Sequence, residues 1–262
     1  MNIKGGAQDS FIKGGSQQIA KKMAKEIGHS KILIDSPVVS IKYTDKKVNV
    51  VCMKKKTISM IRAKHCIIAL SPNLAGRIHY EPALPNLRDQ LTQRMPGGCV
   101  YKIHIFYKKN FWRKSKFSGE VISLKGPISL VYDKSYDGLN CLVAFVAGST
   151  ARNWSKKSKE ERKTEALKQL EDLFNTKDAS KPLNYVEMDW TGEKYSRGCY
   201  FCVATPGTIS ECGEALRKSI GPIHFAGSET AINYFGYMEG ALDAGIRVAN
   251  EVYDQFNVKS KL

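Results

Sequence analysis

The sequence contains no apolar run long enough to span a membrane. The longest such run beside a predicted strand, Cys66–Leu70, is far shorter than the roughly 20 residues that a transmembrane helix needs. The first six residues also lack the apolar stretch of a secretory signal peptide. The sequence therefore predicts neither a membrane span nor a signal peptide within these 262 residues.

Several catalytic and nucleotide-binding motifs are missing as well. The chain has no G-x-G-x-x-G, no Walker loop and no G-x-S-x-G elbow. Its five histidines do not follow the spacing of metal ligands. These absences argue against a P-loop nucleotidase, a serine hydrolase of the elbow type and a histidine-based metal site.

Cysteine does not form a disulfide framework. The seven cysteines are scattered and odd in number, which is typical of free thiols in a reducing compartment. Cys199 and Cys202 form a C-x-x-C, but a zinc ribbon would need a second such pair. A redox dithiol would need a helix starting at the first cysteine, whereas Pro206 and Gly207 follow closely. From local sequence alone, a buried pair of thiols is the simplest interpretation.

Acidic residues are scarce relative to basic ones. The 41 Lys and Arg against 25 Asp and Glu give a formal net charge of +16 and a pI near 9.5. The lysines are spread along the chain, which favours a solvated surface. An anionic membrane surface is a second interpretation, and we expect no specific nucleic acid, because no RNP-type aromatic motif or arginine-rich arm is present.

Hydrophobic periodicity predicts a mixture of helices and short strands. Apolar spacings of three and four predict helices at 17–27, 87–94, 157–174 and 237–256. Alternating or continuous apolar runs predict strands at 32–43, 48–53, 57–62, 65–70, 100–107, 121–124, 128–132, 141–146, 185–190 and 223–226. We expect the pair at 57–62 and 65–70 to lie deepest. The fold class is therefore α+β or mixed α/β, with a sheet rich in antiparallel pairs.

The C-terminal strand runs into a glycine turn before the last helix. Gly227 permits close approach of a ligand, and the helix start offers free N–H groups and a positive dipole end. This arrangement suits a ligand that gains negative charge, as a flavin does on reduction. Most turns of this kind are structural, so the motif alone decides nothing.

Three stretches together resemble the flavin-containing monoamine oxidases. They are Ser196–Tyr200, Phe225–Ala231 and Gly236–Ala241, in the family's order and separation. Gly5–Gln8, Gly14–Ser16 and Phe111–Lys114 fit the same family, so the resemblance covers nearly the whole chain. It implies an antiparallel-rich substrate-domain sheet and a C-terminal flavin-binding strand, loop and helix.

The resemblance also implies roles for individual residues. Cys199 matches the cysteine that carries FAD through an 8α thioether. Tyr200 and Tyr237 match the two tyrosines that flank the amine, and Lys102 matches the lysine that holds a water near the flavin. Further matches to cofactor-binding positions are Val38, Trp190, Gly227, Ser228, Glu229 and Met238. Matches to the substrate cavity are Gln8, Leu130 and Phe145.

Some positions depart from the family pattern. Arg197 stands where glycine is usual and Phe201 where threonine is usual, while Leu130 replaces larger or β-branched gating residues. The family's dinucleotide-binding βαβ unit has no counterpart before Gly5, and no membrane-anchoring helix follows Leu262. We therefore expect the C-terminal part of an oxidase, either as a piece of a longer protein or as a form without its own cofactor domain.

The expected division is a partial FAD-binding segment with a linker helix at 1–40, a substrate-binding domain at 41–190 and a C-terminal FAD-binding segment at 191–262. The expected function is FAD-dependent oxidative deamination of primary or secondary amines to aldehyde, ammonia and hydrogen peroxide, with oxygen as acceptor. The resemblance also implies a location at the cytosolic face of the mitochondrial outer membrane, or otherwise in the cytoplasm, and a homodimer. The alternative is an inactive oxidase-like protein that acts as a basic binding module. A third interpretation, a polyamine- or histone-directed oxidase, is disfavoured because such enzymes usually lack the cysteine that binds FAD covalently.

Overall fold

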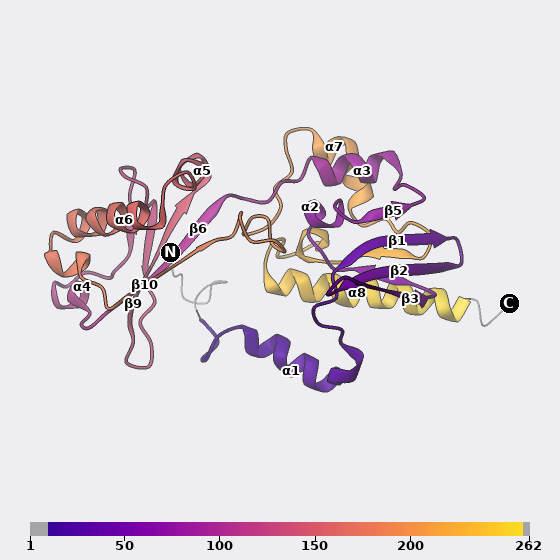
Figure 1. Cartoon of the computed structure of the whole chain (residues 1–262), viewed down its shortest axis with the longest axis horizontal. Helices are drawn as coiled ribbons and strands as arrows, with labels where there is room; N and C mark the ends of the chain where they lie inside the picture. The colour runs from indigo at the N-terminus through magenta and orange to yellow at the C-terminus, as the bar shows by residue number, and fades with distance from the viewer. Residues whose placement is uncertain (1–9, 259–262) are drawn as a thin grey trace.

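The computed structural model describes residues 10–258, which form two lobes joined by two connecting segments (Figure 1). One lobe is built on a five-stranded sheet and is here called the five-stranded lobe. The other has three layers and contains a four-stranded sheet, a two-stranded parallel sheet and the last helix, and is here called the three-layer lobe. Among the described residues, no helix is both long enough and apolar enough to cross a membrane.

The first layer of the three-layer lobe is the four-stranded sheet, in the order β3-β2-β1-β5. Antiparallel pairing joins the first three strands, and β5 pairs with β1 in parallel. Their bounds are β1 Val38–Thr44, β2 Lys47–Lys54, β3 Thr57–Ala63 and β5 His79–Glu81.

The second layer is the parallel pair of β4 (Cys66–Ile68) and β11 (Ile223–Phe225). Parallel strands need both faces covered, and here the four-stranded sheet covers one of them. The shared core holds Ile41, Val48, Ile68, Tyr80, Ile223 and Phe225, none more than 9% exposed.

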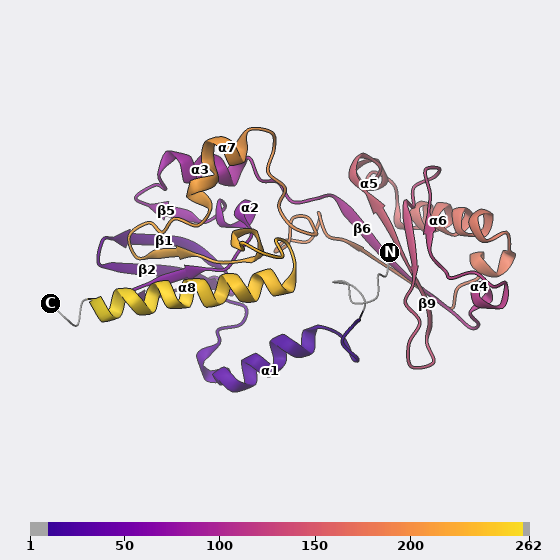
Figure 2. The same ribbon diagram turned by 180° about the vertical axis from the view of Figure 1, so that it is seen from behind.

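Helix α8 (Met238–Val258) forms the third layer and runs along the lobe (Figure 2). It contacts β11 and the short 3-10 helix η4 (Ser228–Thr230). The fully buried His224 of β11 faces it, with Nδ1 lying 2.8 Å from Glu251 Oε1. Arg247 of the same helix donates to the carbonyl oxygen of Phe225 at 2.6 Å. Polar contacts therefore dock α8 onto the strand that leads into the glycine turn.

Short helices close the end of this lobe that faces the connecting segments. They are α2 Pro72–Ala75, α3 Asn86–Gln93, α7 Thr208–Cys212 and the 3-10 helix η3 Gly213–Leu216. Leu91, Met95, Cys202, Cys212 and Leu216 form a small buried cluster among them. Helix α1 (Gln17–Ile27) and the 3-10 helix η1 (His29–Lys31) precede the first strand, and no residue of either is buried.

The sheet of the five-stranded lobe is antiparallel throughout, in the order β10-β6-β9-β8-β7. Its strands are β6 Val100–Tyr107, β7 Val121–Ile122, β8 Leu130–Asp133, β9 Asn140–Ala147 and β10 Asn184–Asp189. Its helices are α4 Phe111–Lys114, α5 Gly148–Trp154, α6 Lys159–Phe174 and the 3-10 helix η2 Lys177–Ser180. Ile103, Leu142, Trp154 and Leu170 pack in the core between the sheet and these helices.

The other side of this sheet, here called the open face, carries the alternate residues of each strand. Along β6, burial alternates, so that Lys102, His104 and Phe106 are half-buried on this side while Ile103 and Ile105 are fully buried in the core. The open face therefore presents polar and apolar side chains on the side of the sheet opposite the buried core.

Most predicted elements are present, which confirms the mixed fold with an antiparallel-rich sheet. The predicted helix at 17–27 and the strand at 100–107 have the observed bounds. The expectation that the 57–62 strand lies deep was wrong: β3 is an edge strand with six of its seven residues exposed, because only β2 pairs with it. Helices α2, α4, α5 and α7 were not predicted. The predicted 41–190 segment supplies strands to all three sheets, since β1 to β5 belong to the three-layer lobe and β6 to β10 to the five-stranded lobe.

Candidate active site

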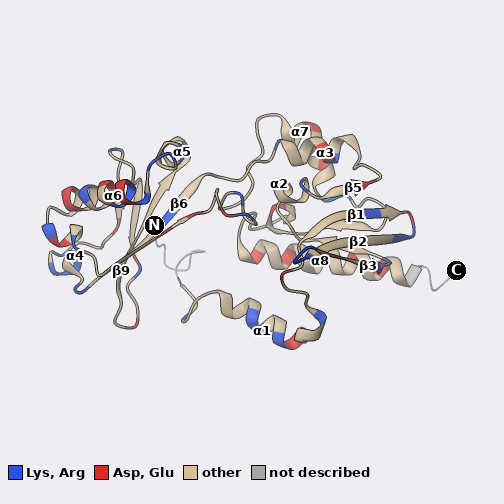
Figure 3. Cartoon of the chain, viewed as in Figure 1, with Lys and Arg blue, Asp and Glu red and all other residues tan. Residues whose placement is uncertain are grey.

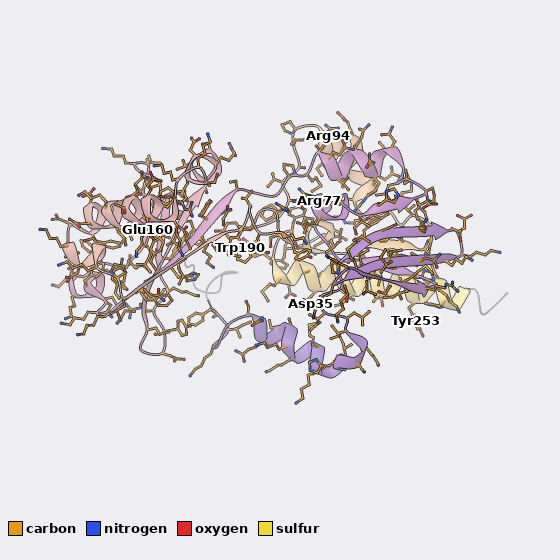
Figure 4. The ribbon with its side chains drawn as sticks, viewed as in Figure 1. Asp35, Arg77, Arg94, Glu160, Trp190 and Tyr253 are labelled. Atoms are coloured by element: carbon orange, nitrogen blue, oxygen red, sulfur yellow. The ribbon has the colours of Figure 1, made fainter. Side chains whose placement is uncertain are left out.

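The two connecting segments pair with each other between the lobes. Cys199 N donates to Gly98 O at 2.9 Å, Val203 N to Pro96 O at 3.0 Å and Thr205 N to Arg94 O at 3.0 Å. Trp190 lies at the start of the second segment, between the lobes (Figure 4), and its carbonyl oxygen accepts from Gly198 N at 2.8 Å. This ladder sets the position of Cys199 and of the residues that follow it.

Gly98 is required by the closeness of the two segments. A β-carbon on Gly98 would lie 2.2 Å from the carbonyl oxygen of Cys199, which no side chain can tolerate. Gly97 is similarly close, since its β-carbon would lie 2.8 Å from the carbonyl oxygen of Arg197. The Gly-Gly pair before a predicted strand is the sequence signal for this approach, and the sequence reasoning did not use it.

The Cys199 thiol is half-buried at this junction. Burial raises its pKa to about 11, and the nearby Lys102 ammonium offsets only part of that rise. The thiol is therefore protonated at neutral pH, and its sulfur could form a new bond only with loss of that proton. Cys202 is 2% exposed, as the interpretation of a buried structural thiol predicts. The peptide bond between Cys199 and Tyr200 is cis.

Tyr200 meets the open face of the five-stranded sheet. Its ring centroid lies 6.1 Å from that of Phe145 on β9, and Lys102 Nζ lies 5.8 Å from the Phe145 ring centroid. Leu130 on β8 is the cross-strand neighbour of Phe145 on the other side. Burial raises the pKa of Tyr200 to about 12, so its hydroxyl stays neutral. Four residues predicted for catalysis or substrate binding are thus brought together.

The glycine turn after β11 is tied to the Cys199 segment through Glu229. The Glu229 side chain is buried, with Oε1 accepting from Cys202 N at 3.0 Å and Oε2 accepting from Ser228 Oγ at 3.1 Å. Gly227 has φ of +101°, a backbone conformation that favours glycine. The turn and the cysteine segment, nearly 30 residues apart in sequence, therefore form one unit.

The loop before α8 makes a second contact with the same segment. The rings of Phe201 and Phe235 meet edge to face with centroids 5.2 Å apart, and a β-carbon on Gly236 would lie 2.4 Å from the Phe201 ring. Tyr237 follows, 46% exposed, and Met238 begins α8, 53% exposed. The first N–H groups of a helix have no acceptor within it, so this end offers donors and a positive dipole beside the junction.

The remaining predicted residues are less closely connected. Val38 is the first residue of β1, opposite Cys52 and 36% exposed, and no described contact joins it to the Tyr200 segment. Gln8 and the Gly5–Gln8 motif lie outside the described residues. The sequence reasoning did not anticipate His104 and Lys134, which share the open face with Lys102; their alternation with buried residues is the signal that could have identified them.

The described residues fit a flat ring system that carries negative charge at one edge. The thiol of Cys199 and the exposed faces of Tyr200 and Tyr237 belong to the segments that Glu229 and Phe235 hold together. The N-terminus of α8 supplies the donors at the same junction. A glycine turn and a helix start beside an antiparallel sheet with an aromatic open face therefore define a candidate site for a flavin in a mixed α/β fold.

Comparison with known proteins gives the particular family. Residues 2–253 match the flavin containing amine oxidoreductase family, and the chain belongs to it. It is 45% identical over 263 residues to the probable flavin-containing monoamine oxidase A of Dictyostelium discoideum, covering 100% of this chain and 57% of that one. It is 37% identical to amine oxidase [flavin-containing] B of Mus musculus, covering 95% and 48%.

A solved structure gives the same result. Cyclohexylamine oxidase from Brevibacterium oxydans superposes with a TM-score of 0.86 at 31% identity, over 93% of this chain and 53% of the other. The chain thus spans about half the length of the relatives it matches. Membership of this family implies a flavin cofactor.

Proposed function

We propose that this chain supplies the amine-binding face and the closing flavin-binding elements of an FAD-dependent amine oxidase. The observation that supports this most directly is the junction at which Glu229 and Phe235 hold the Cys199 segment against the start of α8, beside the open face. Bound FAD would supply the redox chemistry: an amine that becomes an imine gives up two electrons and two protons, which would reach oxygen as hydrogen peroxide, and water would hydrolyse the imine to aldehyde and ammonia.

In this proposal the protein side chains bind and orient. The rings of Tyr200 and Tyr237 present π faces that guide an amine and limit its approach to one orientation. Phe145 and Leu130 supply apolar contacts for the rest of the substrate and exclude water from it. Lys102 places an ammonium beside the Phe145 ring, where it can hold a water. Cys199 is the proposed attachment point of the cofactor.

Val38, Trp190, Gly227, Ser228, Glu229 and Met238 remain proposed cofactor contacts. The buried Glu229 carboxylate already accepts hydrogen bonds from Cys202 N and Ser228 Oγ. Its proposed role is therefore to hold the turn in place, so that the backbone at Gly227 and Ser228 can approach the cofactor. Trp190, half-buried between the lobes, would flank the ring system.

The test is whether flavin is covalently retained. Protein expressed with FAD available is precipitated with acid, and the absorbance of the pellet near 450 nm is recorded. We expect a yellow pellet from the wild type and a colourless one from Cys199→Ala. Cys202→Ala is the matched control, because it removes a second thiol only three residues away, one that is buried in the protein core. This variant should retain the colour.

Colour retained by Cys199→Ala would remove the proposed linkage. A colourless wild type that oxidises no amine and binds anionic vesicles or nucleic acid in a salt-sensitive way would replace the oxidase with the basic binding module. Lysines and arginines are distributed over both lobes, with acidic side chains among them on α6 and α8 (Figure 3). This distribution favours no single binding surface, and association with a membrane, homodimerisation and the mitochondrial location stay predictions.

A further inference from the structure

The open face carries three basic side chains arranged along the strand direction. Strand register places Lys102 level with Phe145 and Leu130, and His104 level with Val143 and Tyr132. Lys134 follows Tyr132 by two residues, and its N–H continues the ladder by donating to Cys141 O at 2.8 Å. Because side chains alternate, Leu130, Tyr132 and Lys134 lie on the same side of the sheet. All three bases are half-buried.

No carboxylate of the described strand residues lies on this face to balance the bases. The acidic side chains of β8 and β10 occupy the alternate positions and are held on the opposite side. Asp133 Oδ2 accepts from Trp112 Nε1 at 2.9 Å, and Asp189 Oδ2 accepts from the Tyr101 hydroxyl at 2.9 Å. Glu187 pairs with Arg162, with an N–O distance of 2.5 Å. The open face therefore has one sign of charge.

The bases influence one another across the face. Burial lowers the pKa of His104, and the charges of Lys102 and Lys134 lower it further. Burial and the charge of Lys102 likewise lower the pKa of Lys134. Lys134 Nζ lies 4.0 Å from the ring centroid of Phe11, so its described partner is an aromatic ring and not an anion. A ligand anion at this face would therefore experience a positive electrostatic potential that no carboxylate of the sheet neutralises.

The two ends of the face differ in distance from Tyr200. Phe145, which contacts Tyr200, lies in the row of Lys102, whereas Lys134 lies in the row of Phe106, four residues further along β6. A strand rises about 3.3 Å per residue, which separates these rows by about 13 Å. Between them lie apolar and aromatic side chains, among them Val143 and Tyr132.

We propose that the open face selects amines whose far end carries a carboxylate, with Lys134 as the residue that determines this preference. This inference rests on the proposed function, since it assumes that the amino group is held at the Tyr200 end. An aliphatic or aromatic spacer then lies over Val143 and Tyr132, and the carboxylate reaches the uncompensated ammonium. A diamine would instead bring a second cation to this end, and like charges brought together oppose binding.

The test uses three ligands with the same eight-carbon chain: 8-aminooctanoate, octylamine and 1,8-diaminooctane. Their dissociation constants for the purified chain are measured by titration calorimetry, with no requirement for turnover. We expect 8-aminooctanoate to bind about tenfold more tightly than 1,8-diaminooctane. Lys134→Glu should invert this order, and Lys134→Gln should reduce the preference to about threefold or less.

Controls separate charge at this site from charge in general. Lys54→Glu, at the exposed end of β2 in the other lobe, changes the net charge equally and should leave the order intact. Octylamine has no charged far end, so its affinity should change by less than about threefold in either Lys134 variant. Circular dichroism confirms that the variants fold, and Lys134→Gln supplies the answer should the charge reversal unfold the lobe.

The outcomes also separate this inference from the proposed function. Equal affinity for the two charged ligands, tighter binding of the diamine, or no binding of any ligand would each overturn the carboxylate preference. The inference fails alone if flavin is retained and octylamine is oxidised while the two charged ligands bind equally. The proposed function fails alone if 8-aminooctanoate binds with the expected preference but no flavin is retained and no amine is oxidised.

Discussion

Helix α8 contains two glycines whose replacement by alanine should have opposite effects. Gly240 lies in the first turn, where a β-carbon would be 2.2 Å from the carbonyl oxygen of Tyr234 and 3.0 Å from the β-carbon of Ala231. Gly245, five residues later, has nothing within 4 Å of an added β-carbon. The loop that Gly240 contacts carries Tyr237, so the comparison measures how tightly the helix start is packed against the candidate site.

The magnitudes follow from two separate contributions. Alanine in a helix interior is favoured over glycine by about 0.5–1 kcal/mol, and this applies to both positions. Forcing an extra carbon into a packed contact costs about 1–3 kcal/mol, and only Gly240 has such a contact. We therefore expect Gly245→Ala to raise the free energy of unfolding by about 0.5–1 kcal/mol. The free energy of unfolding of Gly240→Ala should be about 1–3 kcal/mol lower than that of Gly245→Ala. Both variants gain the same helix preference of alanine, so the difference between them reports the packed contact alone.

Urea unfolding followed by circular dichroism measures both variants on one scale. The midpoint should rise for Gly245→Ala and lie lowest for Gly240→Ala, with the denaturant dependence of the unfolding free energy unchanged. A Gly240→Ala protein as stable as Gly245→Ala would refute the close contact between the helix and the Tyr234 carbonyl. Changes in that denaturant dependence would instead indicate altered compactness of the denatured state.

Two further variants test strain and charge. Arg197 has φ of +53°, a conformation that costs a residue with a side chain about 1–2 kcal/mol and costs glycine little. Arg197→Gly should therefore raise the free energy of unfolding, although the greater freedom of glycine in the unfolded chain offsets about 0.5–1 kcal/mol of the gain. A urea midpoint lower than that of the wild type would contradict this prediction. Burial alone would raise the pKa of Asp133, but hydrogen bonds from Ser135, Trp112 and Arg113 outweigh it and lower the pKa. The ionised Asp133 carboxylate therefore contributes its full stabilisation of the folded state above the pKa of about 3.9 that it has in the unfolded chain. This stabilisation is lost as the pH falls through the lower pKa of the folded state. The stability difference between wild type and Asp133→Asn, measured by urea unfolding, should be constant from pH 5 to 8 and shrink below about pH 4, whereas a difference independent of pH would show that Asp133 is not the titrating group.

Local sequence determined the elements whose signals are short in range. Apolar spacings of three and four within 17–27 and alternation within 100–107 suffice to give the observed helix and strand. The order and separation of the Ser196–Tyr200, Phe225–Ala231 and Gly236–Ala241 motifs sufficed for the family, which the comparisons show. These features depend on residues that are close in sequence or on a pattern carried along it.

Tertiary structure decided which of these elements meet. Apolar content suggested a deep β3, yet burial depends on which element covers a strand, and β3 has a partner on one edge only. Glu229 meets Cys202, and Gly98 meets Cys199, through contacts that span 27 residues in the first case and about 100 in the second. The one-signed open face likewise requires the register of three strands, because the same residues shifted by one position would exchange the bases with the buried core. Pairings of this kind depend on closing long loops and on the summed packing of both lobes, and no local pattern encodes either of them.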